Sequence, residues 1–331
     1  MQDQSFPQPT SYETTPVRES SHSLRRYFIH SFLFLLTFFT TTLAGVQWLN
    51  RDPFELSNFK FGLPYSLSML AILGTHEFGH YFAARYYGVS TTLPYFIPFP
   101  PFLFNPFGTM GAVIRMRGVI SSKKQLFDIG SAGPLAGLVV TFIVLFYGFV
   151  TLPPIQYLYH IHPQYAGLSH IPEGGLTFGN SIFLWILLKT AGHGQFVPPM
   201  NEIYHYPFLC VGWFGLFITA MNLIPVGQLD GGHILYSLAG RRQGHIARIF
   251  FGILILLGLI SFLPLFGSHI QLGTIGWLVF AGILFFIIKL DHPEIYDPYQ
   301  LDINRRIIGW GLMIFFLLIF TPVPFLESTM Q

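Results

Sequence analysis

The chain has 331 residues, of which 52% are hydrophobic and only 10% are charged. Soluble domains usually carry about 25% charged residues, so this composition excludes an ordinary soluble domain and predicts a polytopic membrane protein. The net charge of +2, spread along the chain, excludes a nucleic-acid partner. A single cysteine, Cys210, excludes an intrachain disulfide and a cysteine-based zinc cluster, so a metal site would have to use histidine, aspartate or glutamate.

The chain begins with a polar segment, residues 1–26, which predicts a disordered tail rather than a signal peptide. The apolar runs that follow are about 20 residues long, which is enough to cross a membrane as helices. They predict an all-α fold with six to seven transmembrane helices, at 27–49, 63–88, 126–151, 207–238, 246–266, 271–290 and 306–323. The fourth is interrupted near Pro225, where we expect unwinding, and the short apolar segment 176–191 is expected to be an interfacial or re-entrant helix.

The runs suggest a simple domain organisation. We expect a cytoplasmic tail (1–26), a first anchor with its outer loop (27–61), a membrane domain (62–325) and a short tail (326–331). The membrane domain is expected to consist of a core at 62–240 and C-terminal helices at 246–323. Of the 17 basic residues, all but Arg51, Lys60 and Lys189 lie in alternate connections. The positive-inside rule therefore places the N-terminus in the cytoplasm.

The segment HEFGH, His76 to His80, places two histidines and a glutamate inside the second predicted span. On a helix His76 and His80 lie one turn apart on one face, so both imidazoles can bind a single ion. Glu77 lies beside them, where it can act as a general base. Polar groups facing lipid are costly, which favours a metal site over a chance occurrence of the motif. Catalytic zinc usually takes three protein ligands, so one more must come from elsewhere.

Asp230 is the best candidate for the third ligand. It and Glu77 are the acids inside the predicted spans, while Asp128 lies at the edge of the third span. The predicted orientation puts Asp230 at the same depth as the HEFGH motif. His233, one turn further on, could replace Asp230 as a ligand or hydrogen-bond to it; we favour the second role.

Several motifs together resemble the site-2 protease family of intramembrane zinc metalloproteases, peptidase family M50. HEFGH and N-x-x-P-x-x-x-L-D-G-G, which starts at Asn222, resemble the family's two zinc-binding motifs. DIGSAGPLAG at 128–137 resembles its glycine-rich third core span. GTMGAVIRM at 108–116 and DHPEIYDPYQLDINRR at 291–306 resemble the subgroup shared by bacteria and the plastid gravitropism-deficient, yellow-green homologues. The resemblance covers about residues 62–325.

The resemblance implies one zinc ion per chain, held by His76, His80 and Asp230, with Glu77 as the general base. Asn222 matches an asparagine that helps to hold the substrate or the oxyanion, and we group Pro225 and His233 with it as substrate or oxyanion residues.

The resemblance also implies an activity and partners. The activity is hydrolysis of peptide bonds within or near transmembrane segments, and the partners are single-span membrane proteins, often pre-cleaved by another protease, within the lipid bilayer. We accordingly expect a multi-pass protein of the bacterial cytoplasmic membrane. Unlike many bacterial members of the family, the chain has no segment between Pro153 and Tyr206 suited to a PDZ domain.

The segment 89–119 is too rich in proline and glycine for a spanning helix, but Thr109 to Arg117 suits a strand. We expect a small membrane-associated β-hairpin whose edge, at Thr109, Gly111 and Val113, pairs with an unwound substrate. The alternative is a surface loop with a chance strand.

The third predicted span contains Gly133 and Gly137, four residues apart, a spacing that lets membrane helices approach closely. We expect these glycines to pack the span against the catalytic residues, and Pro134 to bend it.

Two other functions remain open. A metal-ion transporter or sensor could use the same histidine and aspartate cluster, although it would not need Glu77. Another membrane zincin could take a downstream glutamate as its third ligand, but Glu173 and Glu202 lie in the predicted outer loop. We expect that loop's five histidines to be solvated, although their number allows weak metal binding: His160, His162, His170, His193 and His205.

Overall fold

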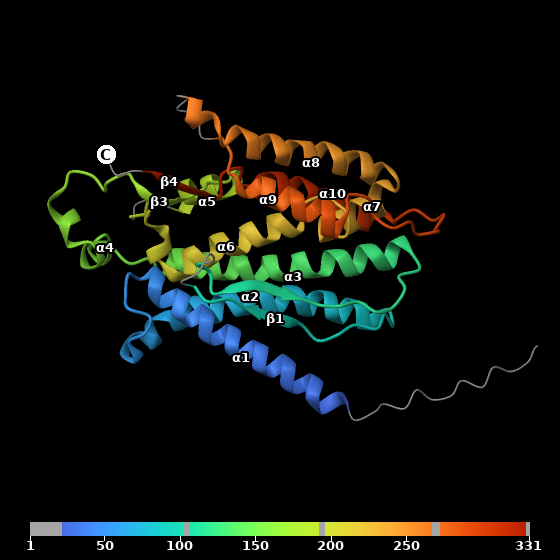
Figure 1. The fold of residues 1–331 in the computed structure, drawn as a ribbon, viewed down its shortest axis with the longest axis horizontal. Coiled ribbons are helices and arrows are strands. Elements are labelled where there is room, and N and C mark those ends of the chain that lie inside the picture. The colour runs from blue at the N-terminus through green and yellow to red at the C-terminus, as the bar shows by residue number, and fades with distance from the viewer. Residues whose placement is uncertain (1–21, 102–105, 192–195, 267–271, 329–331) are drawn as a thin grey trace, which may run out of the picture.

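In the computed structural model, the described residues are 22–101, 106–191, 196–266 and 272–328. Three long helices form one side of the molecule: α1 (His22–Trp48), α2 (Phe59–Tyr86) and α3 (Lys123–Val150). Helix α2 packs between α1 and α3, and the other face of α3 contacts α6 (Pro207–Asn222). Most helices run along the long axis of the molecule, whereas α1 crosses them obliquely (Figure 1).

The C-terminal half adds a second set of helices. They are α7 (Asp230–Ala239), α8 (Arg242–Ile260), α9 (Gly276–Ile283), which continues as a π-helical turn to Ile288, and α10 (Ile303–Ile319). Helix α8 packs on α9 and α7, and α10 contacts α7 and α6. Along the chain, α3 is followed by two short helices, α4 (Gln156–Ile161) and α5 (Ile182–Ala191), which precede α6.

The described residues form two small antiparallel sheets. Strands β1 (Tyr95–Pro98) and β2 (Thr109–Val113) make the predicted hairpin, with Phe96 opposite Ala112. Strands β3 (Gly175–Phe178) and β4 (Phe325–Ser328) pair residues that are far apart in the sequence. The mostly helical fold with a small hairpin is therefore confirmed, while the second sheet was not predicted.

An aromatic cluster explains why β3 and β4 meet. Phe178 on β3 packs against Phe325 on β4, with their ring centroids 5.6 Å apart, and against Trp48 at the end of α1. Trp213 on α6 also contacts both phenylalanines. Large buried rings supply much of the apolar area that stabilises such a junction.

The described helices differ in whether they are long and apolar enough to cross a membrane. Within the described residues, α1, α3 and α8 are long and apolar enough to cross a membrane. Helix α6 and the segment formed by α9 with its π-turn are apolar but shorter. Helix α2 has the length, but the polar residues of the HEFGH motif lower its hydropathy. Three helices of the described residues are thus candidate spans, and the expected number of six to seven is not confirmed.

The element boundaries correct several expectations. The fourth predicted span is divided into α6 and α7, which confirms the break near Pro225. The expected re-entrant helix at 176–191 is wrong in its first part, because residues 176–178 belong to β3. The expected tail at 326–331 is wrong for residues 326–328, which lie in β4. Helix α1 begins inside the predicted tail 1–26; residues 1–21 lie outside the described residues.

Candidate metal centre

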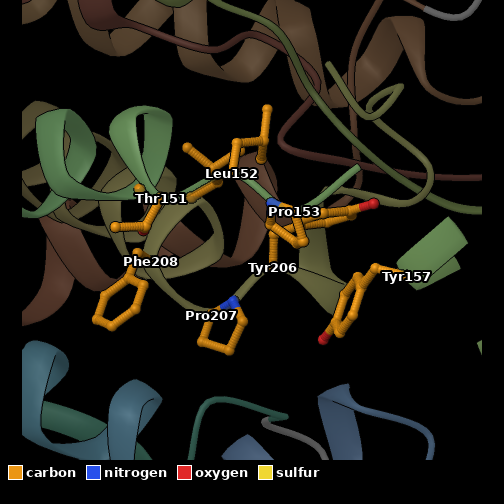
Figure 2. A pocket seen from close by; sticks show the side chains of 9 residues that line it. Thr151, Leu152, Pro153, Tyr157, Tyr206, Pro207 and Phe208 are labelled. Atoms are coloured by element: carbon orange, nitrogen blue, oxygen red, sulfur yellow. The ribbon is translucent and has the colours of Figure 1, made fainter. Parts of the chain in front are cut away.

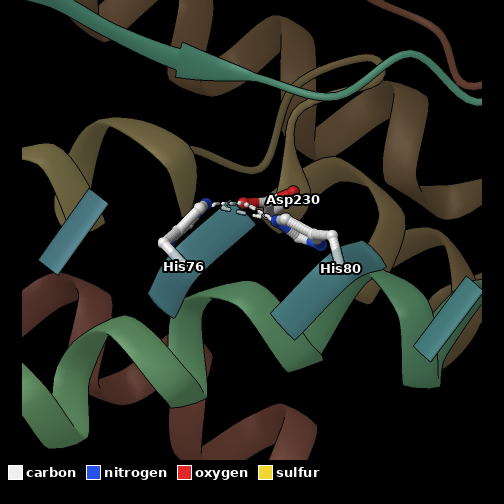
Figure 3. Close-up of side chains that lie close together, drawn as sticks. All are labelled: His76, His80 and Asp230. Atoms are coloured by element: carbon white, nitrogen blue, oxygen red, sulfur yellow. Dashed lines mark hydrogen bonds and ion pairs between the residues drawn. The ribbon is translucent and has the colours of Figure 1, made fainter. Parts of the chain in front are cut away.

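The structure brings His76, His80 and Asp230 together, and their side chains point toward one another (Figure 3). The Nε2 atoms of the two histidines are 3.2 Å apart, and each lies 3.3 Å from Oδ2 of Asp230. All three side chains are largely buried. The two histidines come from one face of α2 and the aspartate is the first residue of α7, so segments far apart in the sequence build the group.

The triangle of donor atoms fits a zinc ion. Ligand atoms about 2.0–2.1 Å from a tetrahedral zinc ion lie about 3.3 Å from one another, which is the spacing found here. Two imidazoles and one carboxylate are also a donor set that catalytic zinc accepts, with the fourth position left for water or substrate. The residues present therefore fit the metal that the motifs predict.

Neighbouring groups orient the histidines. Nδ1 of His80 lies 2.7 Å from the carbonyl oxygen of Ile129 on α3, so this nitrogen donates a hydrogen bond. The lone pair of Nε2 then points toward the other donor atoms, as a metal ligand requires. The side-chain amide of Asn222, the last residue of α6, lies 3.3 Å from Nε2 of His76.

The break between α6 and α7 brings Asp230 to α2. The chain folds back tightly here: Gly227 has a positive φ of 53°, and its N–H donates to the carbonyl of Leu290. A Cβ at Gly231 would lie 1.9 Å from the carbonyl oxygen of Leu223. Only glycine fits at such a contact. The Gly-rich sequence beside Pro225 thus allows the turn that sets Asp230 in place.

Helix α3 approaches the histidines closely. A Cβ at Gly133 would lie 2.1 Å from Nε2 of His80, and one at Gly137 would lie 3.2 Å from Cβ of His76. Gly79 on α2 allows the same approach from the other side, against the backbone of Ala132. The structure thus places both predicted glycines against the histidines, and α3 continues as a helix through Pro134.

Glu77 lies beside the ligand atoms but is not one of them. Its buried carboxyl group has the backbone of Ile114, just after β2, as a hydrogen-bond partner. A cavity of about 240 Å³ opens between this strand and the helices. It is lined by the three ligand residues, by Glu77, Asn222 and His233, and by Ala112 and Val113 of β2 together with Ile114 and Met116, which follow the strand.

The predicted edge residues differ in their surroundings. Val113 is half exposed and borders the cavity, opposite Tyr95 of β1. Thr109 is buried, and its hydroxyl donates to the carbonyl of Ile97. Gly111 has a positive φ of 94°, which bends the strand. The strand is also shorter than the predicted Thr109 to Arg117, since it ends at Val113.

His233 does not hydrogen-bond to Asp230, contrary to the role expected for it. Its Nδ1 lies 2.8 Å from Nε2 of His292, in the connection between α9 and α10. His292 in turn stacks on Tyr236 of α7. The sequence carries no signal for this pair, because His292 is 59 residues further along the chain.

The backbone of Pro225 has a structural contact: its carbonyl oxygen accepts a hydrogen bond of 3.4 Å from the Gln243 side chain. The proline therefore lies in the turn before α7, and no described contact joins it to the three ligand atoms.

One expectation about the connection 151–206 needs correction. His205 is buried, not solvated, and it lies with His162 and Glu202 in a second group of potential ligands. His160 and His170 are exposed as expected, and His193 lies outside the described residues. Sequence spacing does not reveal the group, because His162 is separated from the other two by about 40 residues.

A second hollow lies near that connection, where α3 ends and α6 begins (Figure 2). Its lining is mainly apolar, with Leu152, Pro153, Pro207 and Phe208, and it includes the tyrosines Tyr157 and Tyr206. It holds no acid, histidine or lysine. The cavity at Glu77, by contrast, is lined by acids and histidines.

The sequence is similar to known proteins. The model of peptidase family M50 matches residues 64–265. A rice protein (Oryza sativa subsp. indica) named "Probable zinc metalloprotease EGY2, chloroplastic" is 30% identical over 322 residues, which cover 95% of this chain and 52% of the relative. The protein of that name from Arabidopsis thaliana is 29% identical over 63% of this chain and 35% of its own length. "Probable zinc metalloprotease EGY1, chloroplastic" of Oryza sativa subsp. japonica is 29% identical over 66% of this chain and 39% of its own length. The chain spans about half the length, or less, of these curated relatives.

Proposed function

Since the chain belongs to peptidase family M50, as its motifs predicted, we propose that it is a zinc metalloendopeptidase that cleaves membrane-anchored proteins within or near their transmembrane segments. One observation carries this proposal. His76, His80 and Asp230 form a triangle that fits zinc, and the carboxyl group of Glu77 lies in the same cavity without belonging to the triangle. The relatives' names, which describe zinc metalloproteases, agree with this function.

The chain's own residues divide the chemistry among them. His76, His80 and Asp230 would hold zinc, which supplies a Lewis acid that polarises a carbonyl group and makes water more acidic. Glu77 takes a proton from the attacking water and returns it to the leaving amine. We infer that the Asn222 amide, whose Nδ2 lies 3.3 Å from Nε2 of His76, donates a hydrogen bond to the developing oxyanion.

We propose that the substrate binds in an extended form along β2. A peptide bond in a helix is shielded by the helix's own hydrogen bonds, so the segment to be cleaved has to unwind. The backbone that it exposes needs partners where water is scarce. Strand β2 has β1 as its strand neighbour, and its end borders the cavity that holds Glu77. Pairing with β2 would supply those partners next to the zinc ligands.

The partners proposed are single-span membrane proteins in the lipid bilayer, including products of a first cut by another protease. Such substrates have one transmembrane helix to unwind. A first cut would shorten the part of the substrate that lies outside the membrane, which would let the remaining helix reach a buried cavity.

The proposed topology keeps six to seven spans and the N-terminus in the cytoplasm. Its support is the distribution of basic residues, which gather in alternate connections. The names of the relatives describe chloroplast proteins and give no support to a bacterial membrane. We therefore propose a multi-pass membrane protein without assigning its organism.

The decisive experiment changes Glu77→Gln, which removes the base and preserves the side chain's size. We expect cleavage to be lost while zinc remains bound, because Glu77 is not a ligand. The measurement compares membrane proteomes of cells that carry the wild-type or the variant protein. Fragments with a single transmembrane segment should accumulate with the variant, and zinc per purified chain should be unchanged.

The matched control is Glu173→Gln, since Glu173 is exposed and lies far along the chain from the cavity. This variant should behave as the wild type. Cleavage that persists in Glu77→Gln would contradict the protease mechanism. Zinc-dependent ion flux through vesicles holding the purified protein, without any cleavage, would instead favour a metal transporter.

A further inference from the structure

A second group of metal-binding side chains lies at the end of the molecule where α1 ends and α6 begins. Nε2 of His162 and Nε2 of His205 are 3.0 Å apart, and each lies 3.5 Å from Oε2 of Glu202. The side chains of Glu202 and His205 are 3% exposed, and that of His162 is 19% exposed. These residues come from the connection 151–206, well separated in sequence from the HEFGH motif.

The group has the same composition and size as the first one. Both contain two histidine Nε2 atoms and one carboxylate oxygen, and the three distances are 3.2–3.3 Å at the first site and 3.0–3.5 Å here. These lengths match one face of a tetrahedron around zinc, whose ligand atoms lie about 3.3 Å apart. Both groups of side chains therefore have donor atoms at a spacing that fits a zinc ion.

The backbone fixes the ring of His205 in a ligand orientation. Its Nδ1 lies 2.6 Å from the carbonyl oxygen of Trp48, the last residue of α1, so Nδ1 carries the proton and donates. The lone pair of Nε2 then points at His162 and Glu202. A carbonyl that holds the outer nitrogen of a histidine is the usual partner of a metal-bound imidazole. His80 has the same arrangement with Ile129 at the first site.

Glu202 has one carboxylate oxygen that lacks a partner. Oε1 accepts a hydrogen bond of 3.1 Å from the hydroxyl of Tyr165, whereas the buried Oε2 has no hydrogen-bond partner. A buried, unsatisfied carboxylate oxygen is costly, and a cation between it and two imidazole lone pairs would remove the cost.

We propose that His162, Glu202 and His205 bind a second zinc ion with a structural role. His162 lies just after α4, His205 lies just before α6, and the Trp48 carbonyl belongs to the end of α1. The ion would therefore link the connection 151–206 to the end of α1 and the start of α6. This gives two zinc ions per chain, one more than the sequence predicted. The proposal stands independently of the peptidase function.

The test measures zinc per chain in the purified full-length protein in detergent, by mass spectrometry of the metal. We expect about two zinc ions in the wild type and about one in Glu202→Gln, which keeps the Tyr165 contact but removes the charge. The control His160→Gln changes an exposed histidine of α4 and should retain two. Asp230→Ala removes a ligand of the first site and should retain one.

A second measurement separates the two sites by stability. A chelator should lower the thermal unfolding midpoint of Asp230→Ala, because its remaining zinc is structural. The double variant Asp230→Ala with His162→Gln should show no such shift. One zinc in the wild type and none in Asp230→Ala would overturn the proposal, and would mean that the three side chains share a proton instead. Two zinc ions in Glu202→Gln would overturn it as well.

Discussion

Gly133 controls how closely α3 can approach the zinc ligands. The position a Cβ would take is 2.1 Å from Nε2 of His80, which is inside the volume of that ring. The histidine cannot easily move, because its other nitrogen is held by Ile129. A residue with no side chain is therefore part of the ligand geometry, although it binds nothing.

We expect Gly133→Ala to lower both zinc content and cleavage. The added methyl group would push His80 out of line with His76 and Asp230. Helix content should not fall, because alanine favours a helix by about 1 kcal/mol over glycine. A loss of zinc would therefore report the displacement of His80 and not unfolding of α3. Metal analysis and circular dichroism of the purified variant would measure the two effects.

The matched control for this change is Gly252→Ala on α8, where a Cβ would meet no atom within 4 Å. It should leave zinc content unchanged. Normal zinc content in Gly133→Ala would show that α3 can move away from α2 without disturbing His80.

Strand β2 is the element that would connect the cavity to a substrate. Its end lies beside Glu77, through Ile114, and Val113 is half exposed at the cavity. A short strand with one strand neighbour in the described structure is suited to accept another.

We expect Val113→Pro to reduce cleavage and leave zinc content unchanged. Proline removes an N–H and fixes φ, which opposes pairing along the strand. Each lost hydrogen bond is worth about 1 kcal/mol, so kcat/KM should fall about fivefold or more. Val119→Pro, at an exposed position outside the strand, is the control. Unchanged cleavage at normal protein levels would count against the edge-strand role.

At the scale of the whole molecule, one ion pair joins the C-terminal helices to the catalytic core. Nε and Nη2 of Arg305, at the start of α10, each donate a hydrogen bond of 2.7 Å to the carboxylate of Asp128 on α3. The hydroxyl of Tyr87, just after α2, donates to the same carboxylate. Two parallel bonds of this kind are among the stronger polar contacts in proteins.

We expect Asp128→Asn to lower the thermal unfolding midpoint by a few degrees. The neutral amide cannot accept both guanidinium hydrogen bonds, and the loss of about 1–2 kcal/mol reflects the partial exposure of the pair. Scanning calorimetry in detergent would measure it. Arg248→Gln is the control, since it breaks the more exposed pair with Asp291 and should have a much smaller effect. Equal shifts would contradict the structural role of Asp128.

Local patterns explain what could be predicted. The one-turn spacing of His76 and His80 depends only on helix geometry, and depth in the membrane then singled out Asp230. Hydropathy likewise predicted the long apolar helices and the break at Pro225. The number of spans did not follow in the same way, because apolar helices such as α6 and α9 with its π-turn are shorter than the 18 residues that a span needs.

The sequence by itself determined the chemical class of the molecule, a member of peptidase family M50 with apolar helices, and it predicted His76, Glu77, His80 and Asp230 as the reactive set. These features depend on composition and on the spacing of residues that are close in the sequence, so they can be predicted without the tertiary structure. Only the tertiary structure decided the pairing of β3 with β4, the contact of His233 with His292, and the meeting of His162 with Glu202 and His205. Such contacts join residues far apart in the sequence, and packing of the whole fold sets them.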